Sequence, residues 1–182
     1  MHELGGERNY YDEHSSKAAA WRAGEFIVFP EAIDEDTTVW FACGRDEDGR
    51  TSWEGLLARR VDANRARIAA IPYWARGVSL GDEVSVVESA EGAVVAVDVL
   101  RASGNATLRV GFKNENRETG RRWMTLMREL ERFDCWFDVL SPMFLALSVS
   151  SADFGAVADY LRTREGLGEL EFETARPAAP EI

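Results

Sequence analysis

The chain has 182 residues, 46% of them hydrophobic and six of them tryptophan, so it is long enough and apolar enough to fold around its own core. Its 21 Lys and Arg against 32 Asp and Glu give a net charge of −11, which disfavours binding to the phosphate backbone of a nucleic acid. The sequence contains neither a long apolar stretch for a membrane span nor an apolar signal segment, so we expect a cytoplasmic protein without membrane contact.

Residues 1–23 mix Gly, Glu, Asn and Ser and contain both histidines, His2 and His14, so they predict a flexible arm with at most a short helix. Two apolar runs follow at residues 26–29 and 37–41, rich in β-branched and aromatic residues and separated by a proline and an acidic turn. These two runs predict a hairpin or a strand pair at the start of a barrel-like β part.

The β-rich, barrel-like part spans residues 24–104. Turn signals separate short runs of strand character, which predicts a small barrel. Within the segment 77–84, Gly81 allows an unusual backbone angle and Asp82 can accept hydrogen bonds from neighbouring amides, so the segment is typical of a structural turn. The four predicted strands are 53–61, 65–71, 81–88 and 93–100.

Residues 105–174 show the clearest pattern, and residues 175–182 predict a tail. Alternating apolar residues change to helical spacing and back twice, which predicts the order β-α-β-β-α-β of a ferredoxin-like sandwich with two helices on one sheet face. The fold class is therefore α+β, with a barrel-like part before this sandwich. The predicted elements are a strand at 107–112, a helix at 121–133, strands at 135–140 and 143–149, a helix that Ser150 or Ser151 caps, and a strand ending at 174.

The second face of that sheet is a candidate partner surface, unless it packs against the barrel, as two layers of one chain often do. RNA-binding sheets of this topology surround their aromatic residues with Lys and Arg, whereas this face carries glutamates, which argues against RNA. Alternation places on this face Arg109, Trp136, Asp138, Phe144, Ser148, Glu169, Glu171 and Glu173.

Four segments together resemble a bacterial family named domain of unknown function 4265, over about residues 51–174. They are 53–61, the residues Ile71-Pro72-Tyr73 with Ala75, the segment 77–84 and the segment 101–110. The resemblance implies a compact two-part domain from a bacterium and implies no activity.

The sequence gives little support for an enzyme, and we expect no cofactor. Both histidines lie in the predicted arm, and neither a phosphate-binding glycine loop nor a catalytic Ser-His or Cys-His pair can be assembled. Cys43 and Cys135 show no metal-ligand spacing, and the acidic loop 44–50 does not follow the EF-hand pattern, so no metal site is expected. A carboxylate-based enzyme is the lesser alternative.

Two binding functions remain. The first is an acidic protein-binding module, such as an immunity or inhibitor protein that neutralises a basic toxin or enzyme, because opposite charges speed association. Its partner-binding residues would be Trp136, Asp138, Phe144, Glu169, Glu171 and Glu173. The alternative is a regulatory domain that senses a small molecule in a groove between barrel and sheet. Its ligand-binding residues would be Tyr73, Trp74, Arg76, Asp82, Arg101 and Arg109.

Overall fold

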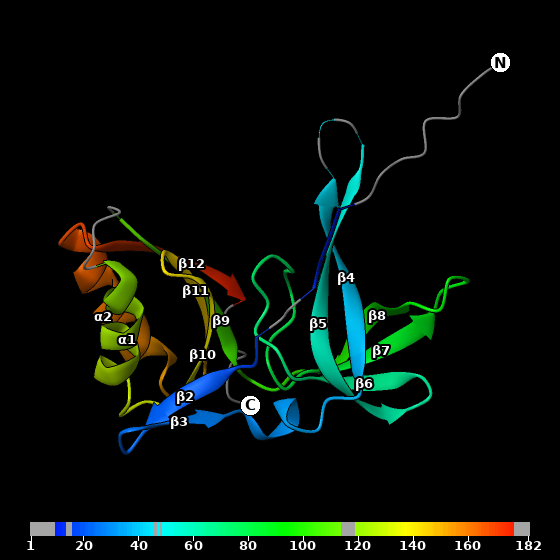
Figure 1. The fold of residues 1–182 in the computed structure, drawn as a ribbon, viewed down its shortest axis with the longest axis horizontal. Coiled ribbons are helices and arrows are strands. Elements are labelled where there is room, and N and C mark those ends of the chain that lie inside the picture. The colour runs from blue at the N-terminus through cyan, green and yellow to red at the C-terminus, as the bar shows by residue number, and fades with distance from the viewer. Residues whose placement is uncertain (1–9, 14–15, 46, 48, 114–118, 177–182) are drawn as a thin grey trace.

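The computed structural model describes residues 10–13, 16–45, 47, 49–113 and 119–176. Two sheets of six strands each lie side by side, and both α-helices of the described part cover the outer face of one of them (Figure 1). The protein is therefore mostly β with two α-helices, which confirms the predicted α+β class.

Five strands of the first sheet close into a barrel, in the order β5-β4-β8-β7-β6 with β6 paired back to β5. They are β4 (Thr37–Arg45), β5 (Thr51–Asp62), β6 (Arg65–Ile68), β7 (Glu83–Glu88) and β8 (Val94–Arg101). The inward residues of these strands are apolar and fill the barrel, including Val39, Leu56, Ala58, Ile68, Val84 and Val86. The predicted barrel is confirmed in this form, with β4 as a strand of the closed sheet.

The second sheet has the strand order β12-β9-β11-β10-β2-β3. Its elements are β2 (Ala19–Arg22), β3 (Glu25–Val28), β9 (Ala106–Phe112), α1 (Thr119–Glu129), β10 (Cys135–Ser141), β11 (Phe144–Val149), α2 (Phe154–Gly166) and β12 (Leu170–Arg176). Apolar side chains of α1, α2 and the four strands from β9 to β12 form one core beneath the helices. Helix α1 ends earlier than the sequence indicated, because the chain turns tightly from Leu130 to Phe133 (backbone N to O, 3.0 Å).

The N-terminal segment differs from the predicted arm and hairpin. Strand β1 (Tyr10–Glu13) pairs in parallel with β5, and β2 pairs with β10 and β3. The run at 26–29 therefore pairs with β2 and not with the run at 37–41, because a short 3-10 helix, η1 (Pro30–Ala32), leads the chain from the second sheet to the barrel. His2 and His14 lie outside the described residues, as do residues 177–182 of the predicted tail.

The second face of the helix-covered sheet packs against the barrel part through the segment 69–82, which joins β6 to β7 between the two sheets (Figure 1). A third apolar cluster lies there, made of Ala18, Ile71, Tyr73, Leu80 and Ala146, with Phe29, Trp136 and Phe144 packed against it. Consequently Asp138 and Ser148 are each only 1% exposed. Much of the face that the sequence suggested for a partner is an internal interface.

Candidate functional site

A buried carboxylate fixes the segment that separates the two sheets. Glu54 points from β5 into the molecule and is fully buried. Its two oxygens accept hydrogen bonds from the backbone N–H groups of Tyr73 (2.7 Å), Trp74 (3.0 Å) and Ala75 (2.6 Å). Three charge-assisted hydrogen bonds to consecutive amides leave this loop little freedom. The side chains of Trp74 and Arg76 are therefore held at a defined place.

Within this loop, the side chain of Tyr73 links the barrel part to the second sheet. Its hydroxyl donates to Oδ1 of Asp138 (2.5 Å), which also accepts a hydrogen bond from the hydroxyl of Ser16 (2.5 Å). Burial raises the pKa of Tyr73, and the negative charge of Asp138 raises it further. Tyr73 is therefore a neutral hydrogen-bond donor of the interface.

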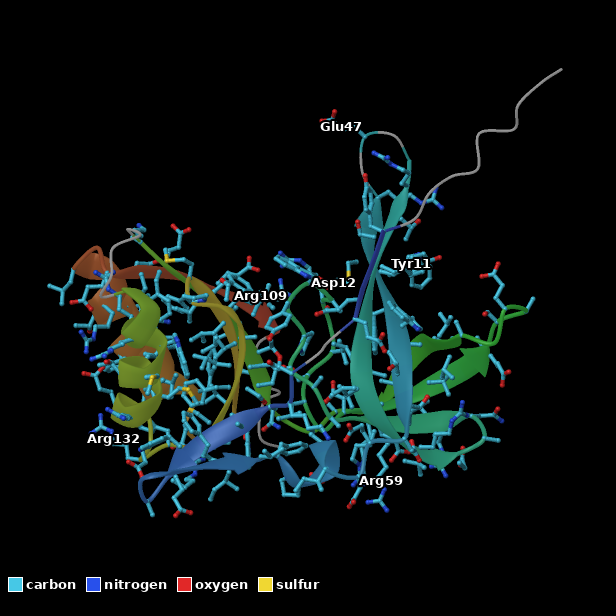
Figure 2. All side chains as sticks on the ribbon, in the orientation of Figure 1. Tyr11, Asp12, Glu47, Arg59, Arg109 and Arg132 are labelled. Atoms are coloured by element: carbon cyan, nitrogen blue, oxygen red, sulfur yellow. The ribbon has the colours of Figure 1, made fainter. Side chains whose placement is uncertain are left out.

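Two adjoining cavities form a cleft between the barrel part and the second sheet, and Trp74, Arg109 and Glu173 line both. The cavity on the barrel side has about 750 Å³ and is also lined by Tyr10, Tyr11, Asp12, Cys43, Ser52, Trp53 and Arg76. The cavity on the sheet side has about 460 Å³ and is also lined by Gly111, Phe144, Glu165, Glu171 and Phe172. Figure 2 shows Arg109 and Asp12 on opposite walls of the space between the sheets.

Arg109 lies at the centre of this cleft and is only 5% exposed. Its Nη1 contacts Oε1 of Glu173 at 2.8 Å, and its Nη2 donates to the carbonyl oxygen of Ala75 at 2.8 Å. Its Nε is buried and has no hydrogen-bond partner among the described residues. The hydrogen bond from Arg109 lowers the pKa of Glu173, which therefore stays ionised. The guanidinium is thus held in one orientation.

Aromatic rings and charged groups surround Arg109. The rings of Trp74 and Phe144 are stacked, 5.5 Å apart and within 11° of parallel, and the indole N–H of Trp74 donates to Asp12 at 3.2 Å. Arg76 is exposed, and its Nη2 makes a long contact of 3.4 Å with Oε2 of Glu173. The guanidinium of Arg50 lies over the ring of Tyr10, 4.9 Å from its centre. The barrel side of the cleft thus combines flat apolar surfaces with arginines.

The two thiols are not activated nucleophiles. Burial, together with the nearby charge of Glu54, raises the pKa of the Cys43 thiol to about 11. Burial likewise raises the pKa of Cys135 to about 12. Cys43 lines the cleft as a neutral, weakly reactive group, and Cys135 is fully buried in the helix-covered core.

Three of the predicted ligand-binding residues, Trp74, Arg76 and Arg109, do meet in the cleft, with Tyr73 buried beneath them. Asp82 does not line either cavity: it is fully buried and accepts hydrogen bonds from the backbone N–H groups of Ser79 (2.9 Å) and Ser103 (2.7 Å). Arg101 lies at the end of β8, where its side chain is exposed 3.7 Å from Glu83. Asp82 is thus part of a turn, as its sequence context indicated.

The predicted partner-binding residues divide into three groups. Phe144, Glu171 and Glu173 line the cleft. Trp136 packs against Phe29 in the interface, with ring centres 5.0 Å apart, and Asp138 is buried beside it. Glu169 directly precedes β12. It lies on the helix side of the sheet, where it pairs with Arg164 of α2 at 2.7 Å. The three glutamates therefore do not form one acidic row.

Sequence reasoning missed the contribution of the N-terminal segment to this site. Tyr10 and Asp12 reach the cleft because β1 pairs with β5, and Cys43 does so from β4. A signal existed in the pair of tyrosines at positions 10 and 11, since two adjacent aromatic residues are unusual for a flexible arm.

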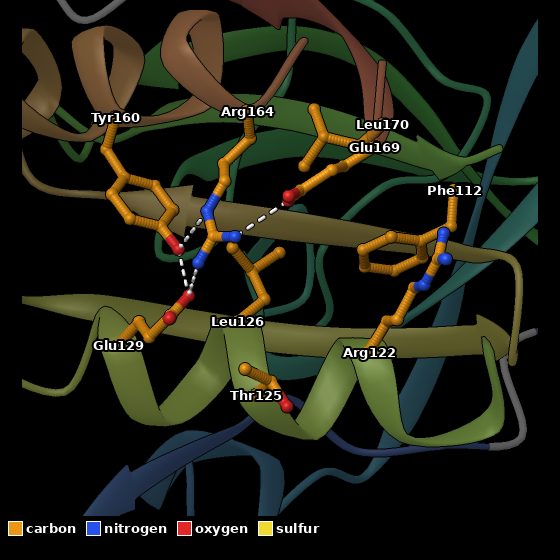
Figure 3. Close-up of a pocket in the computed structure, with 9 residues that line it drawn as sticks. All are labelled: Phe112, Arg122, Thr125, Leu126, Glu129, Tyr160, Arg164, Glu169 and Leu170. Carbon is orange, nitrogen blue, oxygen red and sulfur yellow. Dashed lines mark hydrogen bonds and ion pairs between the residues drawn. The ribbon is translucent and has the colours of Figure 1, made fainter. Parts of the chain in front are cut away.

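A smaller cavity of about 250 Å³ lies between the two helices and the edge of their sheet (Figure 3). Arg164 of α2 fills one end of it and contacts Glu129 of α1 at 2.5 Å, Glu169 at 2.7 Å and the hydroxyl of Tyr160 at 3.0 Å. Tyr160 also donates a hydrogen bond to Glu129. Because Arg164 is already paired with two carboxylates, this network is best explained as a connection between α1, α2 and β12.

Within the described ranges, no group of three or more His, Cys, Asp and Glu residues is arranged to hold a metal ion. The same part of the chain contains no helix that is long and apolar enough to cross a membrane.

Comparison with known proteins gives the family. The family model described as Domain of unknown function (DUF4265) matches residues 54–172, which is well over half of the chain. The chain belongs to this family. The match begins at Glu54 and includes Trp74, Arg76 and Arg109, so the DUF4265 region contains the loop and the central arginine of the cleft. Tyr10, Asp12 and Cys43, on the opposite wall, lie outside that region.

A solved structure from Neisseria gonorrhoeae, described as a hypothetical protein, is similar to this DUF4265 protein. The two share 17% sequence identity at a TM-score of 0.63, over 79% of this chain and 94% of the other. At that identity the likeness shows a shared fold and nothing about activity. No curated protein matches the chain.

Proposed function

We propose that this DUF4265 protein is a non-enzymatic binding module that takes a small organic ligand, with a flat ring and a carboxylate, in the cleft between the barrel and the second sheet. The single observation that carries the proposal is Arg109, a buried arginine at the centre of two adjoining cavities. Ligand pockets combine mostly apolar walls with a few placed polar groups, which fits this cleft.

Arg76 offers a place in the cleft for a ligand carboxylate. The molecule has a net charge of −11, but on the barrel side of the cleft Arg76 and Arg109 balance Asp12 and Glu173, and Arg50 lies over the ring of Tyr10. Glu173 is shared between Arg76 and Arg109, so one carboxylate faces two guanidinium groups. The contact of Arg76 with Glu173 is long, at 3.4 Å, and Arg76 is exposed, so its guanidinium can also pair with a ligand carboxylate in a defined geometry.

The aromatic residues support a flat ring on the same ligand. Trp74 is 44% exposed although it stacks on Phe144, so part of its ring is open to the cleft. Tyr10 lines the same cavity from the barrel wall. A planar ring placed against Trp74 would bury apolar surface without moving the backbone that Glu54 holds.

A thermal-shift screen of aromatic carboxylates tests the proposal, with each acid compared with its uncharged amide, for example indole-3-acetate with indole-3-acetamide. At a ligand concentration about 100 times the dissociation constant, the melting temperature should rise by roughly 5–10 °C. The amides should give a much smaller rise. A panel in which acids and amides act alike would contradict the role of the arginines.

A protein-binding module, such as an immunity or inhibitor protein in the cytoplasm, remains the second candidate. The strand β3 favours it, because this edge strand exposes Phe26, Ile27 and Val28, an apolar run at an open sheet edge in an acidic molecule. The two cysteines are free, which suits a reducing compartment. We also propose that β9 to β12, together with α1 and α2, form a ferredoxin-like unit.

Affinity capture from the native host tests this second candidate. Ile27→Lys should abolish recovery of a basic partner, because it places a charge in the middle of the apolar edge. Val97→Lys, on an exposed position of the barrel, is the matched control. Equal recovery of the partner by both variants would rule out β3 as its binding edge.

A further inference from the structure

A second groove lies on the barrel wall next to the cleft, and Tyr11 and Trp53 line both. It has about 330 Å³ and is lined by Tyr11, Trp40, Trp53, Ser89, Glu91, Ala93 and Val95. Tyr11 and Trp53 are direct neighbours in the pairing of β1 with β5, so their side chains share one face of this ribbon. Figure 2 shows Tyr11 and Asp12 on opposite sides of β1, with Asp12 on the side of Arg109.

The aromatic rings of this groove form a corner. The rings of Tyr11 and Trp40 are perpendicular, at 88°, with centres 5.5 Å apart. Trp40 lies across β5 at Gly55, where an added Cβ would come within 3.0 Å of Cη2 and 3.1 Å of Cζ3 of the indole. One side of the Trp40 ring therefore rests on the strand backbone, and the glycine is what allows it. Trp53 adds a third aromatic side chain to the same groove.

Among the described residues of the remaining wall, the ionisable side chain is the carboxylate of Glu91. Glu91 lies in the turn between β7 and β8, and this turn is closed by hydrogen bonds between Ser89 and Ala93 (backbone N to O, 2.8 Å, and backbone N to hydroxyl, 3.1 Å). None of the seven described residues that line the groove is Lys or Arg. Three electron-rich rings and one carboxylate, without a competing cation among them, attract positive charge.

We propose that this groove binds a quaternary or methylated ammonium group. Such a cation is large, weakly hydrated and attracted to the faces of Trp and Tyr rings, and perpendicular rings contact it on two sides at once. A nearby carboxylate adds Coulomb attraction without requiring a hydrogen bond, which a quaternary nitrogen cannot donate. The group could belong to a free metabolite of the choline type or to a trimethylated lysine side chain, since both present the same chemistry.

Titration with choline, monitored by tryptophan fluorescence, tests the proposal, with 3,3-dimethylbutan-1-ol as the uncharged probe of the same shape. We expect saturable quenching by choline and at least a five-fold weaker response to the alcohol, the size of cation–π discrimination at a partly exposed site. Equal affinity for the two probes would overturn the proposal, as would no saturable response to choline. Trimethyllysine and lysine, each within the same short peptide, then show whether a modified side chain binds better than the free metabolite.

Two variant pairs locate the binding site. Val95→Lys places a cation in the groove and should abolish choline binding, whereas Val97→Lys, at an exposed position of β8 outside the groove, should leave it unchanged. Glu91→Gln should weaken binding about three-fold to five-fold at low salt, and Glu88→Gln, exposed at the end of β7, should not. Equal effects within either pair would contradict this location. Glu91 and Val95 line neither cavity of the cleft, so these variants leave the cleft's residues intact.

Discussion

Three fully or almost fully buried carboxylates hold together the region between the two sheets. Glu54 accepts hydrogen bonds from three backbone amides, Asp82 from two, and Asp138 from the hydroxyls of Tyr73 and Ser16. Removal of a carboxylate from water is unfavourable unless hydrogen bonds replace its hydration, and here they do. These three acids therefore have a structural role.

The replacement Glu54→Gln tests that conclusion at the residue where it matters most. Glutamine has one oxygen in place of two, and its amide N–H group would face a backbone N–H group of the loop. We expect a loss of about 1.5–3 kcal/mol in the free energy of unfolding, measured by urea denaturation. Glu88→Gln, which is exposed, should change it by less than about 0.5 kcal/mol. An equal effect of both replacements would show that the Glu54 hydrogen bonds are dispensable.

At the scale of elements, β5 is the strand that joins β1 to the barrel. It pairs with β4 and β6 within the barrel and with β1 outside it, and it carries Glu54 on one face and Trp53 and Gly55 on the other. Gly55 is the position where the strand tolerates no side chain, because an added Cβ would lie 2.8 Å from Cγ2 of Thr38 and 3.0 Å from the ring of Trp40. Both neighbours belong to β4, which is the strand paired with β5 here.

Gly55→Ala should therefore lower the free energy of unfolding by about 1–3 kcal/mol, since Trp40 must leave its place on the strand. Gly155→Ala is the matched control, because an added Cβ there meets nothing within 4 Å and the residue lies in α2. That replacement should stabilise the protein by about 0.5–1 kcal/mol. Thermal or urea unfolding of both variants measures the contrast, and destabilisation by Gly155→Ala alone would contradict it.

Strand and helix positions could be predicted where local periodicity decides them. The alternation in β5, β7, β8 and β9 and the helical spacing in α1 and α2 each reflect one buried face, so the sequence alone indicated these elements. The partner of a strand cannot be predicted in this way. The run at 26–29 was expected to pair with the next apolar run, at 37–41, but it pairs with β2. The polar composition of residues 1–23 gave no indication of that strand.

The candidate site was predicted in part for the same reason. Trp74, Arg76 and Arg109 could be selected because aromatic and cationic side chains near a turn between two layers suggest a groove. Trp136 and Asp138 were placed on an open face, and whether a face is open depends on long-range packing, which here brings Tyr73 against it. Tyr10 and Asp12 became visible as site residues only once the parallel pairing of β1 with β5 was known.

At the scale of the whole molecule, two sheets meet across a loop that is hydrogen-bonded to both. The two sheets are in contact at Tyr73 and Asp138. Around Arg109 they are separated by the two cavities that form the cleft. The DUF4265 match spans both sheets but not β1 to β4, so one wall of the cleft belongs to the family region and part of the other does not. Relatives that differ in these first strands are therefore expected to differ in ligand preference.

The most direct test of a ligand cleft is isothermal titration of the best aromatic carboxylate from the thermal screen against Arg76→Gln and Arg101→Gln. Both arginines are exposed, at 65% and 69% of their side chains, and each contacts one glutamate, at 3.4 and 3.7 Å. Only Arg76 lines the cleft. Our account predicts that Arg76→Gln weakens binding by about ten-fold or more while Arg101→Gln leaves the dissociation constant unchanged. Equal weakening by both variants, or by neither, would contradict it.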